Sequence, residues 1–217
     1  FFRGAALAFL LAFSELMLVE VANYVNHYYL VAVLALWMAL LPLGRAYGLL
    51  GLLRGENART LPAYVYWCLR LQIGVVYTFA GVAKLTSDWM LYAQPLDIWL
   101  AARAQTPALG AALPIPLLPH LMSWAGAVFD LSIPWLLSSR RTRVPAYLAL
   151  VVFHVLTKWM LPYIGMFPFI MSVAATIFFA PDWPRRLLGR APLPPLESGQ
   201  RAPSHAVAMA LAGLGAH

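Results

Sequence analysis

Charged residues are scarce in this sequence. Asp, Glu, Lys and Arg together make up 11% of its 217 residues, while hydrophobic residues make up 62%. With a mean hydropathy of +0.74, this scarcity excludes an ordinary soluble globular domain and is typical of membrane proteins. The sequence therefore predicts an all-α protein in which several long apolar runs cross the bilayer.

The sequence also lacks the residue patterns of several common sites. Its one cysteine, Cys68, lies inside an apolar run, so no intrachain disulfide can form. The five histidines and this cysteine show no metal-ligand spacing, and neither GxSxG, a P-loop nor GxGxxG occurs. Although the formal net charge is +7, the arginines cluster in short loops between apolar runs, which favours contact with anionic lipid. We expect no metal, no nucleic-acid partner and a lipid environment.

Six apolar runs approach the length of about 20 residues that a helix needs to cross the hydrocarbon core. They are Gly4–Val21, Tyr28–Leu43, Ala63–Leu85, Leu117–Leu137, Val144–Leu161 and Tyr163–Ala180. The predicted fold is therefore a polytopic membrane helix bundle, with about six transmembrane helices in residues 1–190. Between the third and fourth runs, Trp89, Tyr92 and Trp99 alternate with polar groups, which predicts an interfacial or re-entrant element.

The two ends of the chain predict a fragment that lacks its natural flanks. The chain begins with Phe1 rather than Met, and residues 191–217 run from a segment rich in Pro and Arg into another apolar stretch. We interpret residues 191–217 as an exposed linker followed by the start of a truncated apolar segment.

The basic residues predict an orientation. If the six runs alternate in direction, most arginines fall on one side, which the positive-inside rule makes cytoplasmic. These arginines are Arg3, Arg45, Arg54, Arg59, Arg140, Arg141, Arg143, Arg185, Arg186, Arg190 and Arg201. The turn at Asn26 and His27, the end of the third run at Lys84, and Asp88 then lie on the other side. We expect a multi-pass integral membrane protein with its active site on the extracytoplasmic side.

Ionisable side chains inside spanning segments cost about 2.5–3.5 kcal/mol each on insertion scales, so each needs a partner or a function. Eight of them lie within or at the ends of the runs: Glu15, Glu20, His27, Arg70, Lys84, Asp130, His154 and Lys158. Arg70, Tyr77 and Lys84 are spaced by seven, which keeps them close to one helix face. We interpret Arg70 and Asp130 as a structural intramembrane ion pair.

Lys84 has two interpretations. A lysine at the end of an apolar helix can extend its side chain to the membrane interface. Alternatively, the small residues of "AGVAK", Ala80 to Lys84, leave its stem little cover from lipid, and a desolvated amine can act as a general base. His154, taken alone, is better explained as a hydrogen-bonded core histidine than as a site residue.

Several segments occur in an order that is shared with a known family. They are "NHYYL", "LRLQIGVVYTFAGVAKLTSDW", "FDLS", "FH" followed by "IGMFP", and "APDWPRRLL". In these segments the chain resembles the vitamin K-dependent gamma-carboxylase family, also called the horizontally transferred transmembrane domain (HTTM) family. The resemblance runs from about Leu18 to Leu188 and is most specific at R-x-Q-I-x-x-V-Y-x-x-A-G-V-x-K-L.

The resemblance implies a membrane-embedded, vitamin K-dependent carboxylase and epoxidase-like lyase. In the family, the lysine that Lys84 matches deprotonates vitamin K hydroquinone, which lets O2 add. The strong base that results removes a proton from the gamma carbon of a glutamate, and the carbanion captures CO2. The implied cofactor is thus reduced vitamin K, with O2 and CO2 as co-substrates, and the implied partners are a lipid-soluble quinone and a glutamate-containing peptide or protein.

The resemblance also implies roles for individual residues. Asn26 and His27 match the family's Asn and His at the quinone, and His154 matches the histidine of the "FH" motif. The aromatic residues near them would suit the face of a quinone ring; these are Tyr24, Tyr28, Tyr77 and Trp89. Two alternatives stay open at this point: a non-catalytic family member that serves as a maturation or export scaffold, and a small proton-coupled transporter.

Overall fold

A computed structural model of the chain describes residues 2–19, 25–43, 61–105, 116–161 and 164–189. Within these ranges the chain is helical and has no strand, so the predicted all-α fold is confirmed. The chain forms two compact units, Phe1–Phe179 and Ala180–His217. In the second unit, Arg186 of helix α12 (Trp183–Leu187) pairs with Asp182 at 2.7 Å. The predicted roles of Glu20, Tyr24 and the linker 191–217 fall outside the described residues.

Helices occupy all six of the predicted apolar runs. They are α1 (Phe2–Val19), α2 (Asn26–Leu40), α5 (Ala63–Ala83), α9 (Leu118–Ser138), α10 (Arg143–Met160) and α11 (Phe167–Ala174), which continues as the 3-10 helix η3 (Ala175–Phe178). Among the described helices, α1, α5 and α9 are long and apolar enough to cross a membrane. The predicted count of about six spanning helices is therefore not confirmed.

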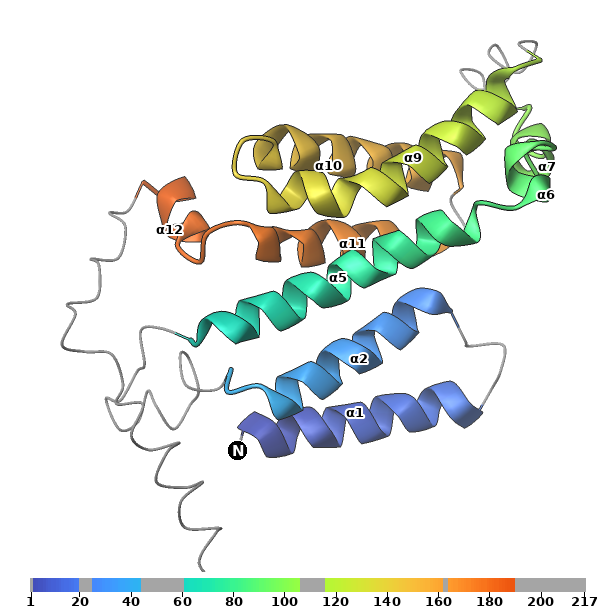
Figure 1. The fold of residues 1–217 in the computed structure, drawn as a ribbon. Coiled ribbons are helices and arrows are strands. Elements are labelled where there is room, and N and C mark those ends of the chain that lie inside the picture. Colours follow the sequence, from blue (N-terminus) through green and yellow to red (C-terminus); the bar gives the residue numbers. More distant parts are fainter. Residues whose placement is uncertain (1, 20–24, 44–60, 106–115, 162–163, 190–217) are drawn as a thin grey trace, which may run out of the picture. The chain divides into compact units, whose positions relative to one another are not determined.

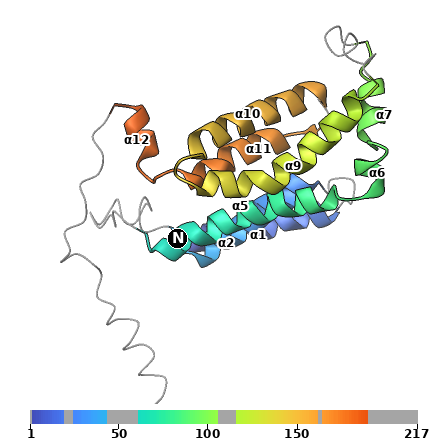
Figure 2. The same cartoon turned by 45° about the horizontal axis from the view of Figure 1, so that its top comes forward.

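In the first unit, α5 lies between the α1–α2 pair and the hairpin of α9 and α10 (Figures 1 and 2). Successive long helices run in alternating directions, as predicted, so α2, α9 and α11 begin at the end of the unit where α1, α5 and α10 finish (Figure 1). This end holds Asn26, Lys84 and Lys158 together. Its assignment to the extracytoplasmic side stays a prediction.

The core of the first unit is built from one apolar stripe of each inner helix. Tyr77 and Ile73 of α5 are buried, as are Leu150 of α10 and Met171 of α11. These side chains meet between α5, α9, α10 and α11, with Leu30 of α2 at the edge of the cluster. Close packing of this kind, rather than the exclusion of water, holds helices together in lipid.

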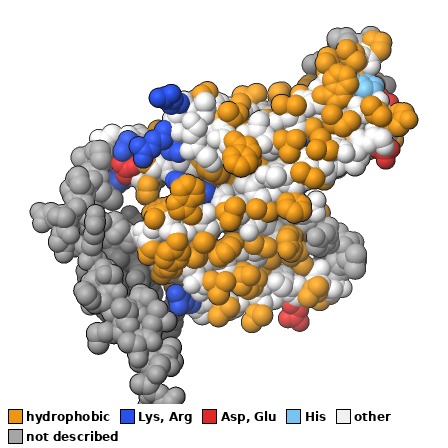
Figure 3. Space-filling view, in the orientation of Figure 1, with side chains coloured by type: hydrophobic (Ala, Val, Ile, Leu, Met, Phe, Trp, Pro, Cys, Tyr) orange, Lys and Arg blue, Asp and Glu red, His pale blue; other side chains and the backbone are white. Residues whose placement is uncertain are grey.

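The outer surface of the first unit is apolar. Leu11, Leu16 and Leu18 of α1 are 68%, 67% and 82% exposed, and hydrophobic side chains cover the middle of the visible face (Figure 3). A monomeric soluble protein rarely exposes an apolar surface this extensive, whereas lipid chains cover it without cost. The structure thus agrees with a membrane protein.

Two short helices follow α5, namely α6 (Ser87–Met90) and α7 (Leu96–Ala101). Neither is long enough to span a bilayer, which agrees with the predicted interfacial or re-entrant element. The Trp124 indole of α9 donates to the Met90 carbonyl at 2.7 Å, and His120 of α9 contacts the Leu91 carbonyl at 3.0 Å. These contacts fix α6 against the first turns of α9.

The closest approach of α5 to α9 occurs at Gly81. A Cβ atom at this position would lie 2.6 Å from Leu131 Cγ, closer than real Cβ contacts allow, and 3.0 Å from the Leu131 backbone nitrogen, which is tighter than most of them. At Gly74, also in α5, a Cβ atom would meet only Pro134 Cβ at an ordinary 3.8 Å. A small residue is therefore required at Gly81 to let the two helices meet.

We expect Gly81→Ala to lower the free energy of unfolding by about 1–3 kcal/mol, because the added methyl group overpacks the α5–α9 contact. Gly74→Ala is the matched control, since alanine favours a helix over glycine by about 1 kcal/mol and the space is available. It should leave stability unchanged or raised. Unfolding of the detergent-solubilised protein measures both, and equal stability of the two variants would contradict the close approach at Gly81.

Candidate functional site

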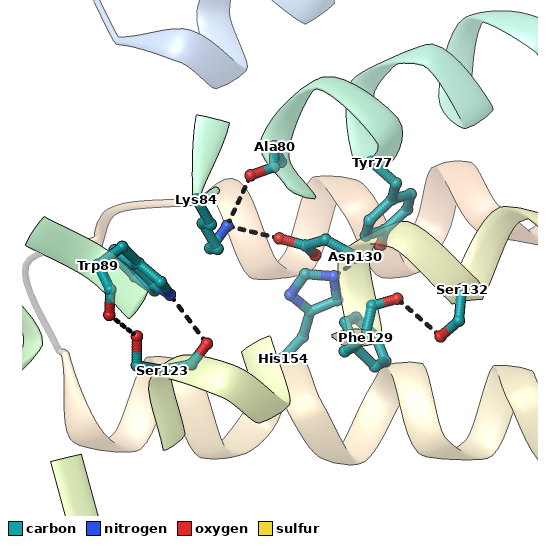
Figure 4. A network of polar contacts seen from close by, with 9 residues as sticks. All are labelled: Tyr77, Ala80, Lys84, Trp89, Ser123, Phe129, Asp130, Ser132 and His154. Atoms are coloured by element: carbon teal, nitrogen blue, oxygen red, sulfur yellow. Dashed lines mark hydrogen bonds and ion pairs between the residues drawn. The ribbon is translucent and has the colours of Figure 1, made fainter. Parts of the chain in front are cut away.

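A buried ion pair joins α5 to α9. Lys84 Nζ lies 2.5 Å from Asp130 Oδ2, and the two side chains are 21% and 7% exposed. Lys84 is the C-cap residue of α5, and its Nζ also donates to the Ala80 carbonyl at 3.2 Å (Figure 4). Because the C-terminal end of a helix carries partial negative charge, the ammonium is stabilised both by its own helix and by the carboxylate of α9.

Arg70 does not pair with Asp130, so this prediction is wrong. Its guanidinium donates instead to three carbonyls at the end of η3, at 3.0, 3.3 and 3.4 Å. These carbonyls belong to Ile177, Phe178 and Phe179. The last carbonyls of a helix have no partner within the helix, so the intramembrane arginine serves as a C-terminal cap.

The axial position of α5 relative to α9 explains why Asp130 pairs with Lys84 and not with Arg70. Gly81 lies against Leu131, the neighbour of Asp130, so the carboxylate is level with the C-terminal end of α5. Arg70 lies about three turns earlier in α5, too far along the helix to reach it. The sequence shows that both cations share a helix face, and only the packing decides which of them meets the acid.

A second buried polar pair lies beside the first. Tyr77 Oη and His154 Nε2 are 2.8 Å apart, and both side chains are buried. Tyr77 lies against Phe129, the residue that precedes Asp130 in α9. The other ring nitrogen, His154 Nδ1, is buried and has no hydrogen-bond partner among the described residues. Since an unpaired buried nitrogen is costly, this atom marks a place where a polar group of a ligand could bind.

Aromatic rings surround the second pair. The Phe129 ring meets Tyr77 edge-on at a centroid distance of 6.2 Å and stacks on Phe153 at 4.0 Å. The Phe167 ring lies 5.7 Å from His154 and 6.4 Å from His27, so it connects the two predicted histidines. The polar groups of the site thus lie among rings and not in bulk water.

The His27 side chain is buried in the first turn of α2 and lies against the loop that contains Gly165. Gly165 has a φ of +70°, and a Cβ atom there would lie 3.2 Å from the His27 ring. Lys158 Nζ donates to the Gly165 carbonyl at 3.1 Å, which ties the loop to α10. Asn26 is exposed, whereas Tyr28, 37% exposed, meets the His27 ring edge-on at 4.7 Å.

The Trp89 ring lies beside the ion pair. Lys84 Nζ lies 5.2 Å from the centroid of its ring, within the range of a cation–π contact. The indole nitrogen donates to the Ser123 carbonyl at 2.8 Å, and the Ser123 hydroxyl donates to the Trp89 carbonyl. Figure 4 shows Trp89, Lys84 and Asp130 in one network of polar contacts.

Most of the predicted site residues lie in two sets of contacting side chains. The first contact set contains Lys84, Asp130 and Trp89, and the second contains Tyr77, His154 and, through Phe167, His27. Within the described residues, no three His, Cys, Asp or Glu side chains form a group that could hold a metal ion. The arrangement can hold and transfer protons beside aromatic rings.

Several residues of the site, among them Ser123, Gly165 and Phe167, have no role in the sequence-based interpretation. Ser123 fixes Trp89, and its place in "MSWAG" gives no signal of this. Gly165 and Phe167 lie in the quoted segment "IGMFP", where the glycine before an aromatic residue could have indicated a tight turn beside a ring. The turn conformation and the contact with His27 come from the structure.

We expect Gly165→Ala to destabilise the protein by about 1–3 kcal/mol, because the new Cβ atom strains a left-handed backbone and collides with the His27 ring. In a His27→Ala background the collision is absent, so the same substitution should cost less. Gly189→Ala controls for backbone strain alone, since Gly189 has a φ of +64° and open space around it. An equal cost of Gly165→Ala with and without His27, measured by unfolding in detergent, would contradict the contact.

A family model described as the HTTM domain matches residues 1–183 of the chain. No solved structure matches the chain. The HTTM domain is found in the vitamin K-dependent carboxylase family, as the resemblance of the quoted segments implies. The matched range includes α1, α2, α5, α9, α10 and α11, and therefore every element that contributes to the site. Because the match covers well over half of its length, the chain belongs to the HTTM-domain family.

Proposed function

We propose that the protein is a membrane-embedded, quinone-dependent enzyme of the carboxylase and epoxidase type, with the Lys84–Asp130 pair as its proton acceptor. The observation that carries this proposal is a half-buried amine and a buried carboxylate, 2.5 Å apart, next to a second pair with an unpartnered imidazole nitrogen. Ionisable groups that meet a specific charge partner in a largely buried place are candidates for functional sites.

The groups present fit a reduced quinone such as vitamin K hydroquinone. Such a ligand has an apolar ring system and two hydroxyl groups, and it partitions into lipid. Rings of Tyr77, Phe129 and Phe167 can contact the ring system, while Lys84 and the unpartnered Nδ1 of His154 can each bind an oxygen. When bound, the hydroquinone supplies the oxygen-dependent chemistry that generates a strong base.

The two members of the ion pair have complementary roles in this proposal. Lys84 transfers its proton to Asp130, and the free amine then accepts the proton of a ligand hydroxyl. The net result is an ammonium beside the oxygen that has lost its proton, and a neutral Asp130. The ligand has thus lost one proton to the Lys84–Asp130 pair. The positive charge of Lys84 stays beside the ligand oxygen that becomes negative, and a charge placed in this way stabilises that oxygen electrostatically.

Burial supports the second half of the proposed reaction. A base strong enough to remove a proton from the gamma carbon of a glutamate would be quenched by bulk water. The rings of Phe129, Phe153 and Phe167 surround the Tyr77–His154 pair, which would limit the access of water to the site in this proposal. We propose CO2 addition to a glutamate of a peptide or protein as the coupled step, on the extracytoplasmic side of the membrane.

A proton-coupled transporter is the second candidate. The two neighbouring polar pairs, Lys84–Asp130 and Tyr77–His154, would also suit a proton path. In that case the same residues would matter for transport, and the full-length protein would form no epoxide. The assay of epoxide formation therefore separates the two functions.

We expect Lys84→Ala to reduce epoxidation of reduced vitamin K by the full-length protein by about 10² to 10⁴, the usual contribution of a general base. Lys84→Arg should lose as much, since a guanidinium keeps the charge but cannot give up its proton. A small amine added in solution should partly restore Lys84→Ala, and Arg141→Ala, at the opposite end of the bundle, should remain active.

Epoxide formed per folded protein is the measurement for these variants. Normal turnover of Lys84→Ala would contradict the proposed acceptor. Activity of Lys84→Arg close to that of the unaltered protein would show that only the charge matters. No epoxide from the unaltered full-length protein would contradict the enzymatic function itself.

A further inference from the structure

We propose that Trp89 is a positioning residue for Lys84, which holds the ammonium group against Asp130 through the face of its indole ring. The effect of Trp89 on catalysis rests on the proposed function, whereas the contact between Trp89 and Lys84 does not. The family resemblance implies that Trp89 contacts the face of a quinone ring. Its ring lies 5.2 Å from the ammonium nitrogen of Lys84, which supports a role that acts through the lysine.

The position of the indole is fixed by two reciprocal hydrogen bonds to Ser123 of α9. The Trp89 Nε1 donates to the Ser123 carbonyl at 2.8 Å, and the Ser123 hydroxyl donates back to the Trp89 carbonyl. Ser123 is fully buried. In addition, the Trp89 backbone nitrogen donates to the Thr86 hydroxyl at 3.3 Å, which caps α6. A ring tied to both α6 and α9 cannot turn away from Lys84 without breaking these bonds.

The ammonium of Lys84 has three N–H donors, and three contacts surround it. Asp130 Oδ2 lies at 2.5 Å, the Ala80 carbonyl at 3.2 Å, and the Trp89 ring provides the third contact. The lysine stands at the end of an apolar helix, where a long side chain would otherwise extend to the interface. The ring opposes this movement and keeps Nζ at the carboxylate.

The contact between the Trp89 ring and the Lys84 ammonium should have a measurable effect on the charge of the lysine. The face of an aromatic ring attracts a cation and not a neutral amine. Removing the ring should therefore increase the fraction of Lys84 that is neutral, with Asp130 still in place. A purely structural tryptophan would affect folding but not the reactivity of one lysine.

Lys84 reactivity toward a small amine-directed acylating reagent tests the contact in the folded full-length protein, with the modified peptide quantified by mass spectrometry. Only the neutral amine reacts. Trp89→Leu should label Lys84 between about twofold and about thirtyfold faster than the unaltered protein, as the strength of cation–π contacts implies. Trp89→Phe keeps a ring face but loses the indole hydrogen bond to Ser123, so its rate should lie between that of the unaltered protein and that of Trp89→Leu.

Trp124→Leu is the matched control. Trp124 also joins α9 to α6 through one indole hydrogen bond, to the Met90 carbonyl, but its ring packs against His120 and not against Lys84. We expect normal labelling of Lys84 in this variant. Equal acceleration in Trp124→Leu and Trp89→Leu would overturn the inference, because it would show that loosening of α6 is sufficient. Equal rates in Trp89→Leu and Trp89→Phe would also overturn it.

Turnover separates this inference from the proposed function. If Trp89 positions Lys84, Trp89→Leu should lower kcat for epoxidation by about tenfold with little change in KM, and Trp89→Phe should restore most of it. A raised KM with normal kcat would overturn the positioning role in favour of direct contact with the ligand. If the unaltered protein forms no epoxide, the proposed function fails, and the labelling rates still decide whether Trp89 holds Lys84.

Discussion

The contact between Lys84 and Asp130 is the constraint on which the other features of the site depend. Removing one charge from water is expensive, and the cost is offset only when a partner of opposite sign lies in good geometry. Here that geometry needs α5 and α9 to approach closely, which Gly81 permits one turn before Lys84. Gly81, the axial position of α5 relative to α9 and the ion pair therefore depend on one another, and a change in any of them affects the others.

The first unit satisfies its remaining polar groups in different ways. Arg70 donates to the carbonyls at the end of η3, which have no partner within that helix. Lys158 bonds the carbonyl of Gly165, which holds the loop against His27. These two cations explain local structure and need no catalytic role. His154 differs from them, because its Nδ1 has no partner within the described residues.

The sequence predicts the class of the fold and much of the list of site residues. Hydropathy is a local property, so the helices follow the predicted runs within a few residues, and the burial cost of ionisable side chains marks Lys84, Asp130 and His154 as residues that need a partner or a function. The partner of each charge is not local. Whether Asp130 meets Arg70 or Lys84 depends on how far α5 slides along α9, which a spacing of seven within one helix cannot determine. The role of Ser123 could not be predicted for the same reason, because it depends on the Trp89 indole, which belongs to another helix.

A double-mutant cycle on the ion pair tests the central claim most directly. Lys84→Met and Asp130→Leu should each lower the free energy of unfolding in detergent by about 3–5 kcal/mol, since each leaves one buried charge without its partner. The double variant has no buried charge at this position, so it should be far more stable than the sum of the two losses predicts. Losses that add within about 0.5 kcal/mol would show that the two side chains do not interact and would contradict the account.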